Sequence, residues 1–169
     1  DKLGCLFGEE FLNQTIQGFG YRKPHGYAGD FEIIDYIYQK KLNEDKRFQK
    51  WDKYLDAQQA CKAVRNRKSY FINLVKEKCL LSRQPLRVLN IASAPCRDVL
   101  ELFEQIPAEK IRIQCVEMDP NAIVYAKKLL GKFSGNVEFI QHNIFKFETE
   151  QKYDLVWSAG LFDYFNDED

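Results

Sequence analysis

Long apolar runs are lacking in this sequence, which argues against a membrane-spanning helix, since such a helix needs ~20 consecutive apolar residues. Histidine is scarce, and the carboxylates do not gather into a set of metal ligands, so we predict no metal site. The five cysteines show no pairing at metal or redox spacing. Unpaired cysteines are typical of free thiols in a reducing compartment, which predicts a cytoplasmic protein.

Charge of one sign does not dominate either, because the formal net charge is zero. Residues 1–83 carry an excess of Lys and Arg, whereas residues 84–169 carry an excess of Asp and Glu. The positive excess is too small and too mixed in sign for a nucleic-acid partner. The split instead indicates two regions of different character.

Residues 1–83 are predicted to form a helical segment. Asp30 is expected to cap a helix that starts directly after it, because its short side chain can accept hydrogen bonds from free backbone amides. Further helices are predicted near residues 46–55 and over about residues 57–81. Their apolar residues recur at helical spacing, which is more typical of a core than of a site. Residues 82–85, with a proline, end the last of these helices.

Residues 84–169 are predicted to form a parallel α/β sheet. Short aliphatic and β-branched runs predict strands, and helices separate the first three of them. The predicted strands are residues 86–91, 111–117, 137–141 and 153–158, and the predicted helices are residues 97–105 and 120–130. This alternation is typical of right-handed βαβ units and predicts a Rossmann-like sheet with helices on both faces.

The loop after the first strand is a candidate ligand-binding loop. Parallel sheets bind ligands at the carboxyl ends of their strands, and small side chains here allow the backbone to approach closely. The positive end of the following helix points the same way. An ordinary tight turn explains the composition equally well. The residues concerned are Asn90, Ala92, Ser93, Ala94, Pro95 and Arg97.

The other strand ends carry acidic, polar or small residues. Glu117 ends the second strand, where a carboxylate can accept hydrogen bonds from both ribose hydroxyls of an adenine nucleoside. Asp119 is expected to cap the next helix. Asn143 follows the third strand, within reach of an adenine edge, and small residues at 158–160 leave room for a ligand. The aromatic residues in 161–165 either wall a substrate pocket or fill the core.

Together, the four strand ends resemble the motifs of class I S-adenosylmethionine-dependent methyltransferases. The matching segments are VLNIASAPC, CVEMDP, VEFIQHNIFKF and YDLVWSAGLFDYF, over about residues 85–166. The resemblance implies S-adenosylmethionine as cofactor. It assigns the ribose to the strand end with Glu117 and Met118, and the adenine to Asn143 and Ile144. The residues that it places near the methyl group are Ser158, Ala159 and Gly160.

A narrower resemblance begins earlier, in the segment KPHGYAGD at residues 23–30. With APCRDVLELF and SAGLFDYF, it is similar to a bacterial group that makes 3-hydroxypalmitic acid methyl ester. The resemblance implies an acyl small molecule whose carboxylate is methylated. A carboxylate is already charged at neutral pH and needs only a donor to hold one oxygen, for which His25, Tyr27 and Tyr164 are candidates. For a hydroxyl or amine acceptor, His25 or Asp163 is the candidate base.

Two alternatives stay open beside this interpretation. The GYAGD segment suits a plain helix turn as well as a lid over the cofactor. The first loop departs from the family, with Asn90 in place of an acid and alanines 92 and 94 in place of glycines, and Asn143 stands where Asp is common. Alanine is strained where φ is positive, so a non-catalytic regulatory module is the alternative function. A nicotinamide-dinucleotide enzyme is less favoured, because ASAPCR lacks the glycines that bind pyrophosphate.

The resemblance also predicts the strand order. The family sheet has strands in the order 3-2-1-4-5-7-6, and this chain ends just past the fourth. We therefore expect the order 3-2-1-4, with the C-terminal strands absent from a truncated domain. The fourth strand would then form an exposed apolar edge, which invites self-association.

Overall fold

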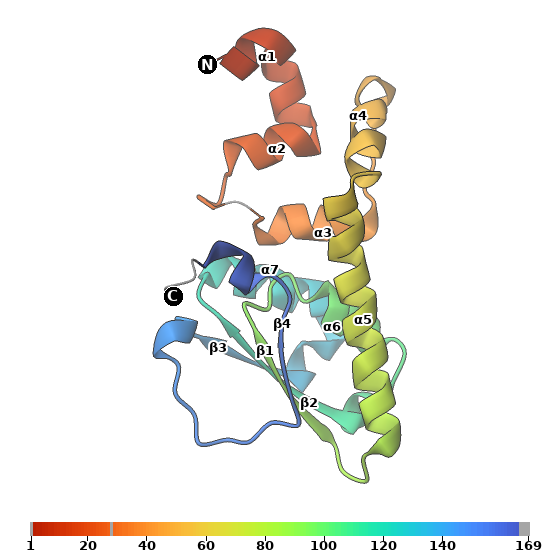
Figure 1. Cartoon of the computed structure of the whole chain (residues 1–169), viewed down its shortest axis with the longest axis vertical. Coiled ribbons are helices and arrows are strands. Elements are labelled where there is room, and N and C mark those ends of the chain that lie inside the picture. Colours follow the sequence, from red (N-terminus) through yellow and green to blue (C-terminus); the bar gives the residue numbers. More distant parts are fainter. Residues whose placement is uncertain (1, 28, 166–169) are drawn as a thin grey trace. The chain divides into compact units, whose positions relative to one another are not determined.

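The structure is a computed structural model that describes residues 2–27 and 29–165, with the backbone alone at residues 2–4 and 164 (Figure 1). Contacts divide the chain into two compact units, Asp1–Asn66 and Arg67–Asp169. The division lies inside helix α5 (Gln59–Leu81), before the boundary predicted after residue 83. The second half of α5 belongs with the sheet because Phe71 and Val75 are fully buried in the core of the sheet unit.

The first unit consists of helices joined by short turns. They are α1 (Lys2–Gln14), α2 (Ile16–Arg22), α3 (Phe31–Gln39), α4 (Lys46–Asp56) and the start of α5. The predicted cap of α3 is confirmed, since Asp30 Oδ1 accepts hydrogen bonds from the amides of Glu32 at 2.9 Å and Ile33 at 3.0 Å. The sequence pattern did not separate α1 from α2.

Aromatic packing holds this helical unit together. Phe11, Leu12 and Phe48 form its buried cluster, and Trp51 packs against them with its ring 5.3 Å from that of Phe11. Gly18 allows α2 to pass close to the end of α1, because a Cβ there would lie 2.2 Å from the carbonyl oxygen of Leu12. A side chain at this position would therefore force the two helices apart.

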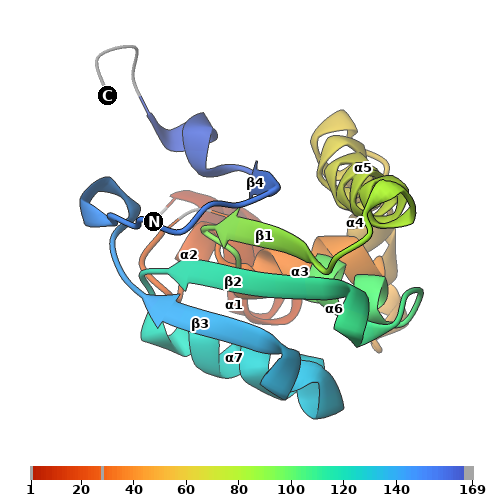
Figure 2. The same cartoon turned by 90° about the horizontal axis from the view of Figure 1, so that it is seen from below.

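The second unit contains a four-stranded parallel sheet in the order β3-β2-β1-β4 (Figure 2). The strands are β1 (Leu86–Ile91), β2 (Ile111–Glu117), β3 (Val137–Gln141) and β4 (Leu155–Ser158). The predicted strand order is confirmed. β4 is shorter than predicted. The amide of Asp154 donates to the carbonyl of Arg87 at 2.8 Å, but the amide of Arg87 donates to the side-chain Oδ2 of Asp154, also at 2.8 Å, and so the regular backbone pairing starts only after this residue.

Helices pack on one face of the sheet in the described chain. α5, α6 (Arg97–Phe103) and α7 (Pro120–Leu130) share one core with the neighbouring strand residues Val88, Ile113 and Val137. The prediction of helices on both faces was therefore wrong for these residues. The path from β1 through β2 to β3 runs in one direction, so right-handed crossovers place α6 and α7 on the same side.

The connection from β3 back to β4 crosses the other face, and the short 3-10 turn η3 (Ile144–Lys146) replaces a helix there. On this face, Tyr153 donates a hydrogen bond to Gln114, whose side-chain amide donates to Glu138 Oε2 at 2.9 Å. β4 pairs with β1 alone among the described strands, and Val156 is 56% exposed on it. In the described part of the chain, no helix combines the length and apolarity needed to cross a bilayer.

Candidate functional site

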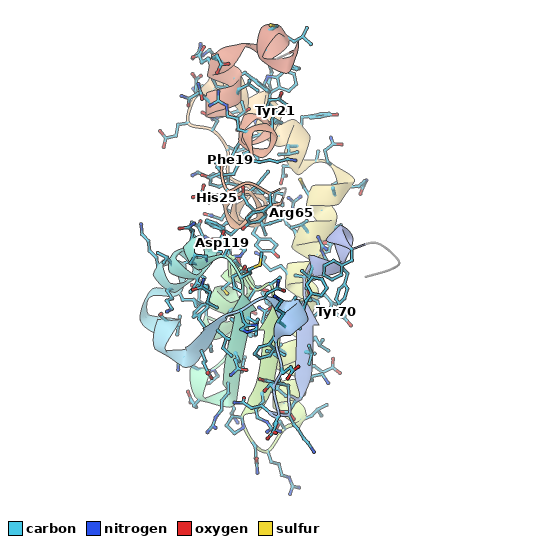
Figure 3. All side chains as sticks on the ribbon, turned by 90° about the vertical axis from the view of Figure 1, so that its left-hand side faces the viewer. Phe19, Tyr21, His25, Arg65, Tyr70 and Asp119 are labelled. Atoms are coloured by element: carbon cyan, nitrogen blue, oxygen red, sulfur yellow. The ribbon has the colours of Figure 1, made fainter. Side chains whose placement is uncertain are left out.

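The carboxylate of Glu117 is held at the carboxyl end of β2. Its Oε1 accepts hydrogen bonds from the backbone amides of Met118 at 2.8 Å and Asp119 at 3.0 Å. Its Oε2 lies 3.4 Å from the amide of Ala94, in the loop after β1. Met118 itself is exposed, and Asp119, labelled in Figure 3, caps α7 as predicted. The structure thus brings the predicted ribose acid and the predicted first loop together.

The loop between β1 and α6 has a left-handed residue where glycine would be unstrained. Ala92 adopts φ 50° while its amide donates to the carbonyl of Val116 at 2.9 Å. Left-handed backbone costs a non-glycine residue about 1–2 kcal/mol. Ala94 does not share this conformation, whereas Cys96 does, with φ 63°. Pro95 is buried, and Arg97 starts α6 half-buried.

Buried polar atoms without partners gather at the ends of β1 and β4. Asn90 Nδ2, Ser93 Oγ and Ser158 Oγ are buried and make no hydrogen bond within the described residues. Ser158 pairs in register with Ile91, so these atoms belong to adjacent strand ends. An unsatisfied buried polar atom costs about 1–3 kcal/mol. Their concentration here, beside the Glu117 carboxylate, indicates a site for a polar ligand.

The end of β3 is organised by Asn143. Its Oδ1 accepts from the amide of Phe145 at 3.0 Å and so caps η3. The amide of His142 donates to the carbonyl of Glu117 at 3.0 Å, which joins this segment to the end of β2. Ile144 is half-buried next to Asn143. The amide oxygen predicted to meet adenine therefore already bonds the chain, with one lone pair left over.

The loop after β4 contains an ion pair that the sequence did not indicate. Arg67 Nη1 lies 3.1 Å from Asp163 Oδ2, and a Cβ added to Gly160 would lie 3.5 Å from the same nitrogen. Arg67 comes from α5, 96 residues before its partner, so no local motif could reveal it. Asp163, predicted as a base, is thus an exposed carboxylate paired with a cation. Ala159 is half-buried beside Gly160.

Exposed aromatic rings connect the loops after β3 and β4. The ring of Phe165 lies 4.9 Å from that of Phe145 and 5.7 Å from that of Phe162. Phe145 is 63% exposed and Phe162 is 71% exposed, so these two rings do not fill the core. Between the two functions considered for the aromatic residues, the exposure favours the wall of a binding surface. The side chain of Tyr164 lies outside the described residues.

Two predicted residues belong to the helical unit. His25, labelled in Figure 3, has its Nε2 3.7 Å from Glu32 Oε2 and its ring 4.3 Å from that of Phe31. Tyr27 is 39% exposed in the turn before α3. No group of three or more His, Cys, Asp or Glu side chains could hold a metal ion in the residues that the structure describes.

Asp98, in the first turn of α6, was not selected from the sequence. It is 5% exposed, and its Oδ1 accepts from the amide of Val99 at 2.9 Å. Burial raises the pKa of this carboxyl from 3.8 to about 6. Between these values the folded chain keeps a proton that the unfolded chain has lost, so the free energy of unfolding falls as the pH rises from about 4 to about 6.

We expect Asp98→Asn to remove this pH dependence. At pH 8 the variant should be more stable than the wild type by about 3 kcal/mol, because the pKa is raised by about two units and each unit corresponds to about 1.4 kcal/mol. At pH 4 the two proteins should unfold alike. Urea unfolding at both pH values measures the difference in the free energy of unfolding between the two proteins. The other titrating groups contribute equally to both proteins and therefore cancel in this difference. An equal stability difference at both pH values would contradict the assignment.

The comparisons with known proteins agree with this geometry. A parallel sheet in the order β3-β2-β1-β4 with helices between its first three strands defines a Rossmann-like class of fold. Residues 82–169, more than half of the chain, match the family model described as a methyltransferase domain, and the chain belongs to that family. No match was found among the curated proteins.

One solved structure shares the fold at low identity, and others match the chain with lower scores. A possible exported protein from Bordetella parapertussis is 17% identical, with a TM-score of 0.65, over 88% of this chain and 48% of its own. The chain thus spans about half the length of that protein. A SAM-dependent methyltransferase from Geobacter sulfurreducens in complex with S-adenosylhomocysteine is 16% identical, with a TM-score of 0.42, over 57% and 36% of the two chains. The N-methyltransferase NodS from Bradyrhizobium japonicum, also in complex with S-adenosylhomocysteine, is 18% identical, with a TM-score of 0.42, over 75% and 54%.

Proposed function

We propose that the chain is the cofactor-binding part of an S-adenosylmethionine-dependent methyltransferase. The observation that carries the proposal is the edge at β1, β2 and β4, where the Glu117 carboxylate lies beside buried polar atoms without partners. This set fits the cofactor chemically. A ribose diol supplies donors for a carboxylate, and an amino-acid carboxylate supplies acceptors for hydroxyl and amide donors.

Each strand end has a separate function in this proposal. Glu117 accepts from the ribose hydroxyls, with Met118 beside it, and Asn143 and Ile144 hold the adenine. The amide of Asn90 and the hydroxyls of Ser93 and Ser158 bind the polar end of the cofactor. Backbone groups of the first loop complete the set at Ala92, Ala94, Pro95 and Arg97, and Ala159 and Gly160 leave space at the reacting end. When bound, S-adenosylmethionine supplies a methyl group on a sulfonium.

The proposed acceptor is the carboxylate of a fatty acid, which needs alignment rather than a base. Arg67 supports this acceptor, since its exposed ion pair with Asp163 is weak and a substrate carboxylate can replace it. The exposed rings of Phe145 and Phe162 suit an acyl chain. His25, Tyr27 and Tyr164 are proposed as further donors to the substrate. A hydroxyl or amine acceptor would instead require His25 or Asp163 as a base.

Calorimetric titration tests the cofactor first. We expect one saturable site for S-adenosylhomocysteine and no binding of NAD, because the first loop lacks the glycine backbone that pyrophosphate needs. Binding of NAD alone would contradict the proposal. Binding of neither compound would favour the regulatory alternative, which the strained Ala92 already supports.

A labelled methyl group on the cofactor then identifies the acceptor. With 3-hydroxypalmitic acid, the expected product is the methyl ester, and label on the hydroxyl would contradict a carboxylate acceptor. We also propose a cytoplasmic location, which the free cysteines support in the described part of the chain. Self-association through the edge of β4 is proposed on the exposure of Val156 and is tested by sedimentation.

A further inference from the structure

The helical unit contains a cleft that the proposed methyl-transfer site does not use. Its volume is about 280 Å³, and all of its lining residues lie between Asn13 and Asp52. The rings of Phe19 and Tyr36 form part of the wall and meet edge to face, with centroids 5.7 Å apart (Phe19 is labelled in Figure 3). Asp52 of α4 is also in the lining. A cleft with aromatic walls and a carboxylate has the composition of a small-molecule site.

One oxygen of the Asp52 carboxylate accepts no hydrogen bond within the described residues. The side chain is 2% exposed, and its Oδ2 accepts from the backbone amide of Asn43 at 2.6 Å. Its Oδ1 is buried and accepts no hydrogen bond from any residue that the structure describes. The side chain of Asn43 bonds other residues: its Oδ1 accepts from the amide of Asp45 at 2.8 Å, and its Nδ2 donates to the carbonyl of Gln14. A buried charge of this kind is unfavourable unless a cation or donor joins it.

The aromatic wall of the cleft favours a positive charge. The Lys41 ammonium already lies over the Tyr36 ring, 4.5 Å from its centroid. Burial raises the pKa of Tyr36, and the nearby carboxylates of Glu32, Asp35 and Asp30 raise it further, so these carboxylates contribute negative potential at the ring, which the Lys41 ammonium partly offsets. Aromatic faces and negative potential both attract an ammonium group.

We propose that this cleft binds a small organic molecule through a protonated primary amine, which donates a hydrogen bond to Asp52 Oδ1 and lies against the rings of Phe19 and Tyr36. A divalent metal ion fits less well, because Glu44 is the other carboxylate of the described lining and such ions require more oxygen ligands. A quaternary ammonium fits less well because it has no N–H for the unpartnered oxygen. The lining of the cleft shares no residue with the proposed cofactor site.

Calorimetry of the whole chain with 1,4-diaminobutane tests the proposal. We expect one saturable site for this diamine and none for n-butanol, which has a similar chain but no charge. Asp52→Asn should weaken binding about tenfold or more, because a hydrogen bond to a charged group is lost. The amide retains an oxygen for the Asn43 backbone, and circular dichroism checks the fold. Glu9→Gln is the matched control, since Glu9 is an exposed acid in α1 outside the cleft, and its affinity should equal that of the wild type.

Amide chemical shifts of the wild type give a second measurement that needs no variant. The diamine should move the signals of Asn43 and its neighbours in the cleft and leave those of the sheet unit unchanged. The proposal is overturned if the diamine does not saturate a site, if Asp52→Asn binds it as tightly as the wild type, or if the shifts lie outside the cleft. Equal binding of tetramethylammonium would overturn the hydrogen bond to Asp52.

Discussion

Glu117→Ala should weaken binding of S-adenosylhomocysteine to the chain by about ten- to a hundredfold. The carboxylate is positioned by the amides of Met118 and Asp119, with its second oxygen facing the first loop. A ribose diol can donate to it, and the net loss of one hydrogen bond to a charged group costs about 1.5–3 kcal/mol, which corresponds to about ten- to a hundredfold in affinity. Calorimetric titration of the wild type and the variant measures the ratio of the dissociation constants.

Two further variants make this result specific. Glu104→Ala removes an exposed acid at the end of α6 and should bind as the wild type does. Glu117→Gln keeps an acceptor but loses the charge, so its affinity should lie between those of the wild type and the alanine variant. Equal affinity of Glu117→Ala and the wild type would show that another residue holds the ribose.

The second large effect concerns the core of the sheet unit. We expect Phe71→Ala to lower the free energy of unfolding of this unit by about 3–5 kcal/mol, because the truncation leaves a cavity in a packed core. Phe71 is 0% exposed, and its ring lies 5.1 Å from that of Trp157 on β4. Urea unfolding followed by tryptophan fluorescence measures the change. Both proteins also carry the substitution Trp51→Phe, so that the fluorescence comes from Trp157 alone.

Asn73→Ala provides the comparison on the same helix, since Asn73 is exposed and its loss should change stability little. If Phe71→Ala were as stable as Asn73→Ala, the second half of α5 would not belong to the core of the sheet unit. The predicted boundary after residue 83 would then describe the chain better than the division at Asn66.

The local elements could be predicted from the sequence because their causes are local. Aliphatic and β-branched runs bounded by turn residues gave β1, β2 and β3 their observed limits. Asp30 and Asp119 cap the helices that follow them, since a cap depends on one side chain and the next few amides. Glu117 could be selected for the same reason, because position at a strand end fixes where a carboxylate lies.

Features that depend on distant residues were missed. Arg67 meets Asp163 only after α5 packs on the sheet, and the burial of Asp98 depends on several elements at once. The one-sided packing of the helices was also missed, although the sequence predicted helices only between the first three strands. The strand order 3-2-1 and the right-handed crossovers were both expected from the sequence, and only their combination places α6 and α7 on the same face.

The one-sided packing has a consequence for the way the protein is made. α6 and α7 each connect the two strands that they help to cover, and α5 directly precedes β1, so the covered face is built from near neighbours in the chain. Near neighbours meet quickly, and a chain leaves the ribosome in sequence order. That face can therefore assemble during synthesis from β1 to β3. β4 emerges later and pairs with β1 at the edge opposite to β3. There the amide of Arg87 donates to the side chain of Asp154, 67 positions away.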